Sequence, residues 1–356
     1  MTNDPKAPGL RRAPVAELPQ VHQIVLPTPW EVGPVQIYLI EGDPITLVDT
    51  GVRSEPSRAA LAAALDALGV GFEDVRRVVL THHHGDHLGQ AQSLRSAGAD
   101  LEVLAHEAER ELVENFSEDR EEDIVATRAL FTEHGVPGEL LDRQAEMRRR
   151  WISEDPVLCE PTRVDRELRS GDRIGFKDFD LEVIHAPGHT AGHLLLHEPC
   201  SRTLFTGDHL MGDAVPFTET YYESGAPDPR DPLARRPRFR GLPAYMASLR
   251  ELRGRSFRTI LPAHGGIVER PSRCIEDAIL FYEVRVQRIE RALEKLSAEC
   301  GATAWEIWCS LFPKADPVTQ MRTRMLMVIG GLDVLEDAGR AVPERRADGV
   351  IAYRPR

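Results

Sequence analysis

Residues 80–90, "LTHHHGDHLGQ", place four histidines and one aspartate within the six positions from His82 to His87. An apolar run with the pattern of a buried strand precedes them. In an extended segment, side chains at positions i and i+2 point to the same side, so His82 and His84 can bind one metal ion. Asp86 and His87 then turn toward a neighbouring point. Imidazole and carboxylate groups suit zinc and similar ions, so this H-x-H-x-D-H spacing predicts a metal site.

Further residues of metal-binding type follow at the ends of later apolar runs. The stretch "HAPGHTAGH" contains His189, "LFTGDHL" contains Asp208, and "LPAHGG" contains His264. Each stretch holds glycine or proline beside the ligand, which is typical of a chain that leaves a strand. In an open α/β architecture, such strand ends gather along one edge. The seven residues are enough for two metal ions, and two ions close together form a hydrolytic pair.

These motifs and their order resemble the metallo-β-lactamase superfamily over most of residues 22–270. "THHHGDH" is similar to the signature loop of that family, "APGHTAGH" to its third-histidine motif, "FTGDHL" to its bridging aspartate and "LPAHG" to its final histidine. "LVDTG", which contains Asp49, resembles its early Asp-Thr-Gly turn. The resemblance implies an α/β fold of the αββα sandwich type, with the metal site at one edge.

The resemblance also implies which residues bind which ion. The residues that match the ligands of the first metal are His82, His84 and His189. Those that match the ligands of the second are Asp86, His87 and His264, with Asp208 as the bridge between the ions. The expected cofactors are two Zn²⁺ ions, with iron or manganese as alternatives. Asp86 is also the catalytic candidate that orients the nucleophile and handles its proton, and Asp49 is expected to fix the orientation of a ligand.

The expected activity is that of a dinuclear metal-dependent hydrolase. A water shared by two ions would ionise near neutral pH, and the resulting metal-bridging hydroxide would attack a thioester or ester. Acyl-CoA and glutathione thioesters are the substrate classes that the resemblance favours, through a subgroup similar to glyoxalase II and to β-lactamase-like protein 2. The alternative is an RNA or DNA phosphodiesterase, like an endoribonuclease, that uses the same two metals.

The rest of the chain suggests three parts. Residues 1–20 are Pro-rich and polar and are expected to be a flexible N-terminus, and residues 21–285 to be the catalytic domain. A strongly charged helical insertion is expected within it at about 106–152, either as a solvated surface or as a cap over the substrate. Helical patterns followed by two short strands around an "ADG" turn make residues 286–356 resemble a winged-helix domain. Its apolar and acidic last helix favours packing or homodimer formation over DNA reading.

Composition narrows the possible partners. The 356 residues carry 44 basic and 57 acidic side chains, a net charge of −13, which disfavours broad nucleic-acid binding. No apolar run is long enough to span a membrane, and the five scattered cysteines fit a reducing cytoplasm. A small-molecule substrate is therefore expected. The arginine-rich segment 230–240 could hold substrate phosphates, or it could be a solvated loop that balances the acidic surface.

Overall fold

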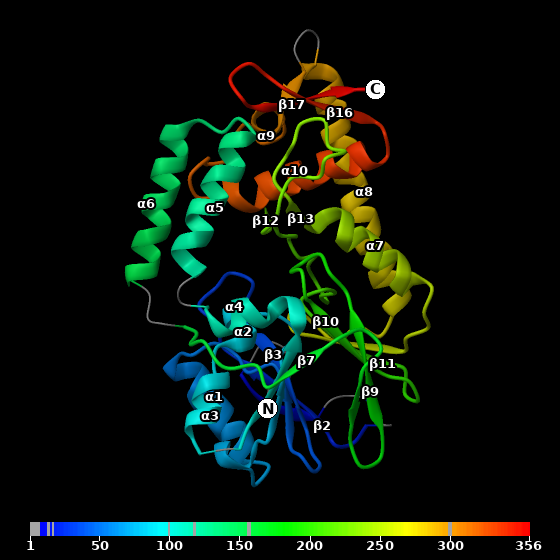
Figure 1. The fold of residues 1–356 in the computed structure, drawn as a ribbon. Coiled ribbons are helices and arrows are strands. Elements are labelled where there is room, and N and C mark those ends of the chain that lie inside the picture. Colours follow the sequence, from blue (N-terminus) through cyan, green and yellow to red (C-terminus); the bar gives the residue numbers. More distant parts are fainter. Residues whose placement is uncertain are drawn as a thin grey trace. The chain divides into compact units, whose positions relative to one another are not determined.

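The computed structural model describes residues 8–12, 15, 18–98, 100–116, 119–154, 158–297 and 301–356 (Figure 1). Most of the N-terminal segment expected to be flexible, 1–20, lies outside these residues, although Gly9–Arg12 within it forms strand β1. The chain folds into two compact units. The first unit comprises residues 1–119, 155–216 and 251–276, and the second comprises 120–154, 217–250 and 277–356. The domain limits expected from the sequence stay a prediction.

A seven-stranded mixed sheet lies in the first unit. Its strands, in spatial order, are β1 (Gly9–Arg12), β2 (Val21–Leu26), β3 (Val35–Ile40), β4 (Thr46–Val48), β5 (Arg77–Val79), β6 (Glu102–His106) and β7 (Arg166–Leu168). Neighbours from β1 to β4 are antiparallel, and neighbours from β4 to β7 are parallel. The carboxyl ends of the parallel strands therefore meet at one edge of the sheet.

A second, five-stranded sheet belongs to the same unit. Its order is β14 (Thr259–Pro262), β11 (Thr203–Gly207), β10 (Leu194–Glu198), β9 (Asp180–His185) and β8 (Arg173–Gly175). Only the β11–β14 pair is parallel, and its register sets Gly207 opposite Pro262. The residues that follow these two strand ends must consequently emerge side by side.

The two sheets pack face to face through an apolar core. Side chains from both sheets share one buried cluster, in which the ring of Tyr38 on β3 meets that of Phe205 on β11 edge to face at 5.3 Å. The opposite face of the seven-stranded sheet is covered by helices α1 (Glu55–Asp66), α2 (Gly85–Leu88) and α3 (Ala91–Ser96). Alternate residues of each strand thus serve two different cores, which explains the almost continuous apolar runs in the sequence.

Short helices follow β6 and long ones build the second unit. The former are η2 (Glu107–Glu109) and α4 (Arg110–Glu114), and a 3-10 turn, η1 (Phe72–Asp74), precedes β5. The elements that lie wholly or mostly in the second unit are α5 (Asp119–Glu133), α6 (Gly138–Glu154), β12 (Thr220–Tyr222), β13 (Arg238–Arg240), α7 (Gly241–Arg253), α8 (Pro271–Leu296), β15 (Ala302–Thr303), α9 (Ala304–Leu311), α10 (Met321–Asp337), β16 (Ala341–Arg345) and β17 (Ile351–Pro355). Strands β15, β17 and β16 form a small antiparallel sheet, and β12 pairs with β13.

The two mixed sheets and their helices confirm the predicted α/β class. The charged stretch at about 106–152, which was expected to be helical, contains η2, α4, α5 and most of α6. Strands β1, β7, β8, β12, β13 and β15 were not predicted, because these short segments contain no extended apolar run. The described cysteines, Cys159, Cys200, Cys274 and Cys309, are free thiols, and Cys300 lies outside the described residues. Within the described ranges, no helix is both long and apolar enough to cross a membrane.

Candidate metal centre

The H-x-H-x-D-H stretch lies where strand β5 passes into helix α2. The strand ends at Val79, and the loop that follows carries His82 and His84. Asp86 and His87 lie in the single turn of α2, which begins at Gly85. The helical turn places Asp86 and His87 at a second point beside the first, and the ring centroids of His82 and His87 lie 4.0 Å apart.

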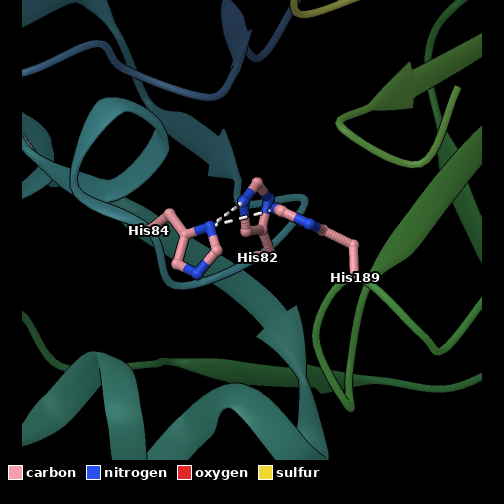
Figure 2. A group of neighbouring side chains, drawn as sticks. All are labelled: His82, His84 and His189. Atoms are coloured by element: carbon pink, nitrogen blue, oxygen red, sulfur yellow. Dashed lines mark hydrogen bonds between the residues drawn. The ribbon is translucent and has the colours of Figure 1, made fainter. Parts of the chain in front are cut away.

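The first point gathers three imidazole rings. Nδ1 of His84 lies 3.0 Å from Nε2 of His82 and 3.1 Å from Nε2 of His189. Figure 2 shows His189 reaching in from a different loop, the one between β9 and β10, so that the ring nitrogens of all three side chains converge. His82 and His189 are buried and His84 is half-buried. These three residues form one of the groups able to hold a metal ion.

The second point gathers Asp86, His87 and His264. Nε2 of His264, which follows β14, lies 3.1 Å from Oδ2 of Asp86. Nε2 of His87 lies 3.7 Å from Oδ1 of the same carboxylate. All three side chains are buried, so two imidazoles and one carboxylate face a common point inside the protein.

Asp208 lies between the two groups. Its Oδ1 atom is 3.4 Å from Nε2 of His87 and 3.5 Å from Nε2 of His264. Its Oδ2 atom is 3.5 Å from Nε2 of His189. One carboxylate oxygen therefore faces each group, which is the arrangement expected of a residue that bridges two ions.

The donor atoms fit metal ions. Nε2 of His87 and Oδ1 of Asp208 are buried and have no hydrogen-bond partner in the described part of the chain. Buried polar atoms are rarely left unpaired, and a bound ion is one group that would pair both of these atoms. A tetrahedral ion with bonds of about 2.0–2.2 Å needs donors about 3.3–3.6 Å apart. The separations around Asp208 lie in this range, and those within the histidine group are slightly shorter.

Residues behind the donors fix the direction of two rings. Oδ2 of Asp49 lies 2.7 Å from Nδ1 of His87, and the carbonyl oxygen of Pro34 lies 3.0 Å from Nδ1 of His264. Each Nδ1–H donates to its oxygen, which leaves the Nε2 lone pair directed at the metal point. Asp49 also accepts hydrogen bonds from the backbone N–H and the hydroxyl of Thr81. The ligand-orienting role expected for Asp49 agrees with these contacts.

Burial and neighbouring charges set the protonation of the donor side chains. Burial and the surrounding histidines hold the pKa of His82 well below its ordinary value, so this ring keeps a free lone pair. Burial alone would raise the pKa of Asp208, but His264 and His87 outweigh it and hold that pKa well below the ordinary range. Burial lowers the pKa of His87, whereas Asp49, Asp86 and Asp208 raise it well above the ordinary value. The site thus holds ionised carboxylates beside histidines, and a metal at His87 would displace a proton.

The other histidines of the motifs support the loops. His83 does not join the two groups above, and its Nδ1 lies 2.5 Å from Oε2 of Glu109. The backbone N–H of Asp208 donates to Nε2 of His193, over 3.2 Å. His185 donates from Nε2 to the carbonyl oxygen of Ala191 and stacks on His106, with ring centroids 3.9 Å apart.

Two contributors carry little signal in the sequence. The hydroxyl of Thr81 donates a hydrogen bond to Asp49, and its Oγ1 atom lies 3.1 Å from Nδ1 of His82. A threonine beside a run of histidines forms no pattern that a sequence analysis would recognise. Glu109 is buried against both histidine loops, although its surroundings suggested a solvated charged stretch. The only indication in the sequence was its position just after the apolar strand β6, because the histidines of the H-x-H-x-D-H segment likewise follow a strand of this sheet, β5.

The arginine-rich segment forms ion pairs within the second unit. Three of its five arginines face acidic residues of α10. Nη2 of Arg235 is 2.7 Å from Oε1 of Glu336, and Nη1 of Arg238 is 2.7 Å from Oδ2 of Asp333. Of the remaining three, Arg240 pairs with Asp337, Arg230 pairs with Asp228, and Arg236 stacks over the ring of Tyr222. Neither of the roles considered for this segment, phosphate binding or a solvated loop, describes the contacts of Arg235 and Arg238.

Comparisons with known proteins agree with this geometry. The family model described as "Metallo-beta-lactamase superfamily" matches residues 30–264. The "Probable metallo-hydrolase YqjP" of Bacillus subtilis (strain 168) is 29% identical over 316 residues, which cover 88% of this chain and 91% of that protein. A "Hydroxyacylglutathione hydrolase" of Fuscovulum blasticum is 28% identical over 163 residues, which cover 46% of this chain and 43% of that protein.

A solved structure is similar over nearly the whole chain. A metallo-β-lactamase family protein of Thermus thermophilus has a TM-score of 0.73 and 25% sequence identity, covering 96% of this chain and 100% of that one. The matched family segment contains all seven predicted ligands and both strand edges that carry them. With its paired histidine and aspartate groups at the edge of two packed sheets, the chain belongs to the metallo-β-lactamase superfamily.

Proposed function

We propose that the protein is a two-metal hydrolase that cleaves a small thioester or ester. The observation that carries the proposal is the position of Asp208, whose two carboxylate oxygens face two separate groups of donors. The proposed ligands are His82, His84 and His189 for one ion, and Asp86, His87 and His264 for the other. Zn²⁺ suits these donors, and iron or manganese would also be accepted by histidine and aspartate.

Two ions held by these residues would supply an activated water and would polarise the carbonyl oxygen of the substrate. The protein's part is to direct the donors, exclude bulk water and move one proton. Burial would raise the pKa of Asp86, but His87 and His264 lower it, so this carboxylate stays ionised at neutral pH. Its Oδ2 atom lies 3.1 Å from Nε2 of His264, so Oδ1 is the oxygen that would orient the attacking water and accept its proton.

The thioester class is supported by two observations. A protein named hydroxyacylglutathione hydrolase is a relative at 28% identity over 46% of this chain. The arginines of segment 230–240, which could have held the phosphates of coenzyme A or RNA, are engaged with acidic or aromatic side chains of their own unit. A short acyl thioester can bind without arginines that contact phosphates. The net charge of −13 disfavours the binding of a polyanion such as RNA.

We also propose that the C-terminal part is a winged-helix-like module with a packing role. The element order α8, β15, α9, α10, β16, β17, in which helices precede a two-stranded hairpin, supports this proposal. In a winged helix, α10 would be the reading helix. However, α10 buries Met325, Ile329 and Leu332 among its residues, and its acidic side chains bind the arginines described above. Such a helix is poorly suited to enter a DNA groove. A homodimer formed through this module stays a prediction.

The test is metal analysis together with substrate assays. Purified protein should contain about two metal ions per chain and hydrolyse members of an acyl-CoA and acyl-glutathione panel. Removal of the metals with a chelator should abolish turnover, and added Zn²⁺, iron or manganese should restore it. The Asp208→Asn variant should keep the fold and lose at least about 100-fold in activity together with one metal.

A labelled RNA belongs in the same experiment. Cleavage of RNA that depends on Asp208, with no thioester turnover, would replace the proposed substrate class by the phosphodiesterase alternative. Failure of the wild type to bind metal, even after reconstitution with each of the three ions, would refute the two-metal hydrolase itself.

A further inference from the structure

Glu109 is a buried acid outside the predicted ligand set. It ends the 3-10 turn η2, which begins directly after strand β6 and whose first turn is capped by Nδ1 of His106. The side chain is fully buried, whereas its neighbour Glu107 in the same turn forms an exposed ion pair with Arg169. An isolated buried carboxylate is strongly unfavourable, so its partners must compensate.

Both oxygens of Glu109 are fully used. Oε2 accepts a hydrogen bond from the backbone N–H of His83 at 2.9 Å and lies 2.5 Å from Nδ1 of the same residue. Oε1 accepts from the hydroxyl of Thr190 and from the backbone N–H of Gly192, both at 2.7 Å. Burial would raise the pKa of Glu109, but His83 and these donors lower it to about 2, so the carboxylate is ionised.

These four contacts join two loops that come from different sheets. His83 lies between His82 and His84 in the loop after β5. Thr190 directly follows His189 in the loop between β9 and β10. A single carboxylate therefore connects the segment that carries two donors of the first group to the segment that carries the third.

The backbone at Gly192 approaches this carboxylate closely. A Cβ atom at position 192 would lie 2.6 Å from Cγ and 2.9 Å from Oε1 of Glu109. Real Cβ atoms do not approach so closely, so a larger residue at 192 would push the carboxylate away. The close approach of loop and acid is thus part of the local structure and not a chance contact.

We propose that Glu109 is a positioning residue that holds the two loops at the separation required by the first metal ion. The inference rests on the proposed two-metal function and adds a residue to it. Glu109 touches neither substrate nor metal; it acts through the backbone and ring of His83 and through Thr190. The second group is held differently, by Asp49 behind His87 and by the carbonyl of Pro34 behind His264. Loss of Glu109 should therefore reduce the metal affinity of the first group far more than that of the second.

The experiment measures the two metal dissociation steps separately. Wild-type protein loaded with Zn²⁺ is titrated with a competing chelator, and the His189→Ala and His264→Ala variants identify which step belongs to which group. In Glu109→Gln, the dissociation step that is absent from His189→Ala should show about 10–100-fold weaker metal affinity. The affinity of the other step should change by less than about threefold. Gln is nearly isosteric, but its amide would place a donor against the N–H groups from which the carboxylate accepts.

Two further variants complete the design. Glu107→Gln is the matched control, because it removes a carboxylate from the same turn but only an exposed pair; both metal steps should stay unchanged. Thr190→Val removes one donor with little change of shape, so it tests the same connection even if the glutamate variants do not fold, and it should weaken the same step by a smaller factor.

The outcomes separate the two proposals. A wild type without metal would refute the proposed function. A wild type with two ions, combined with unchanged steps in Glu109→Gln or in Thr190→Val, would overturn the positioning role of Glu109. Equal weakening of both steps would also overturn it, because a general loss of stability affects both groups alike.

Discussion

Oδ2 of Asp49 lies 2.7 Å from Nδ1 of His87, and both side chains are buried. Asp49 has a backbone φ of +62°, an uncommon value outside glycine, which the hydrogen bonds from Thr81 stabilise. The pair selects the His87 tautomer whose Nε2 faces Asp208. The orientation of the His87 ring therefore depends on a residue 38 positions earlier in the chain.

The first prediction concerns the Asp49→Asn variant. An amide cannot accept from Thr81 and His87 on both of its atoms, so the His87 ring loses its fixed direction. Metal affinity of the second group and hydrolytic activity should each fall by about 10–100-fold, with the fold retained. Chelator competition and steady-state assays measure the two effects. Asp66→Asn, at the exposed end of α1, serves as the control; equal metal binding in both variants would contradict the role of Asp49.

The second prediction concerns Gly207, the residue before Asp208, which is the proposed bridge between the two ions. Gly207 has a φ of +47°, and a Cβ atom there would lie 2.7 Å from Oγ1 of Thr81 and 2.9 Å from Nε2 of His193. Gly207→Ala should lower the free energy of unfolding by about 1–3 kcal/mol and displace Asp208, so activity should fall more than stability alone explains. Thermal unfolding and assays at a temperature far below the transition test this.

Gly266→Ala is the matched control for this variant. Its Cβ atom would meet no atom within 4 Å although it lies two residues after His264. If Gly266→Ala and Gly207→Ala lost activity equally, the contact with Thr81 and His193 would not be the cause.

The third prediction concerns a buried ion pair in the second unit. Asp333 on α10 is fully buried and binds Arg238, which is 8% exposed. Asp333→Ala would leave the guanidinium buried without its partner and should cost about 3–5 kcal/mol of unfolding free energy. Asp337→Ala removes an aspartate that is 51% exposed, four residues along the same helix, and should cost less than about 1 kcal/mol. Urea unfolding followed by tryptophan fluorescence compares them; similar midpoints would show that the buried pair is not a stabilising contact.

The fourth prediction concerns pH. Burial and the charge of Arg238 lower the pKa of His134 to about 4, although Glu133 and Asp333 act in the opposite direction. Between about pH 6.5 and 4 the unfolded chain binds a proton that the folded chain does not, so stability falls as the pH decreases. The contribution of this residue should be about 2 kcal/mol between about pH 7 and pH 5.

The test compares the wild type with His134→Gln, because glutamine keeps a donor for the carbonyl oxygen of Leu130. The difference in unfolding free energy between the two proteins should change with pH in this window. A difference that is independent of pH would mean that His134 titrates with an ordinary pKa in the folded protein.

Much of the candidate metal centre could be predicted from local sequence. The H-x-H-x-D-H segment encodes its two directions within six residues, because an extended loop and one helical turn are both local structures. His189, Asp208 and His264 were recognisable because each follows an apolar strand beside glycine or proline. Long helices such as α8 were equally predictable, since twenty-six residues repeat their apolar pattern many times.

The remaining features depend on contacts between segments far apart in the sequence. Glu109 looks like any acid of a charged stretch, and only the approach of the His83 and Thr190 loops makes it a buried connector. The arginines of 230–240 could have met solvent, substrate or protein, and α10, about a hundred residues later, determines which. Local sequence thus determined which side chains can bind metal. The tertiary structure decided which charged side chains are buried and paired, because desolvation depends on every segment that covers a charge and not on its neighbours in the chain.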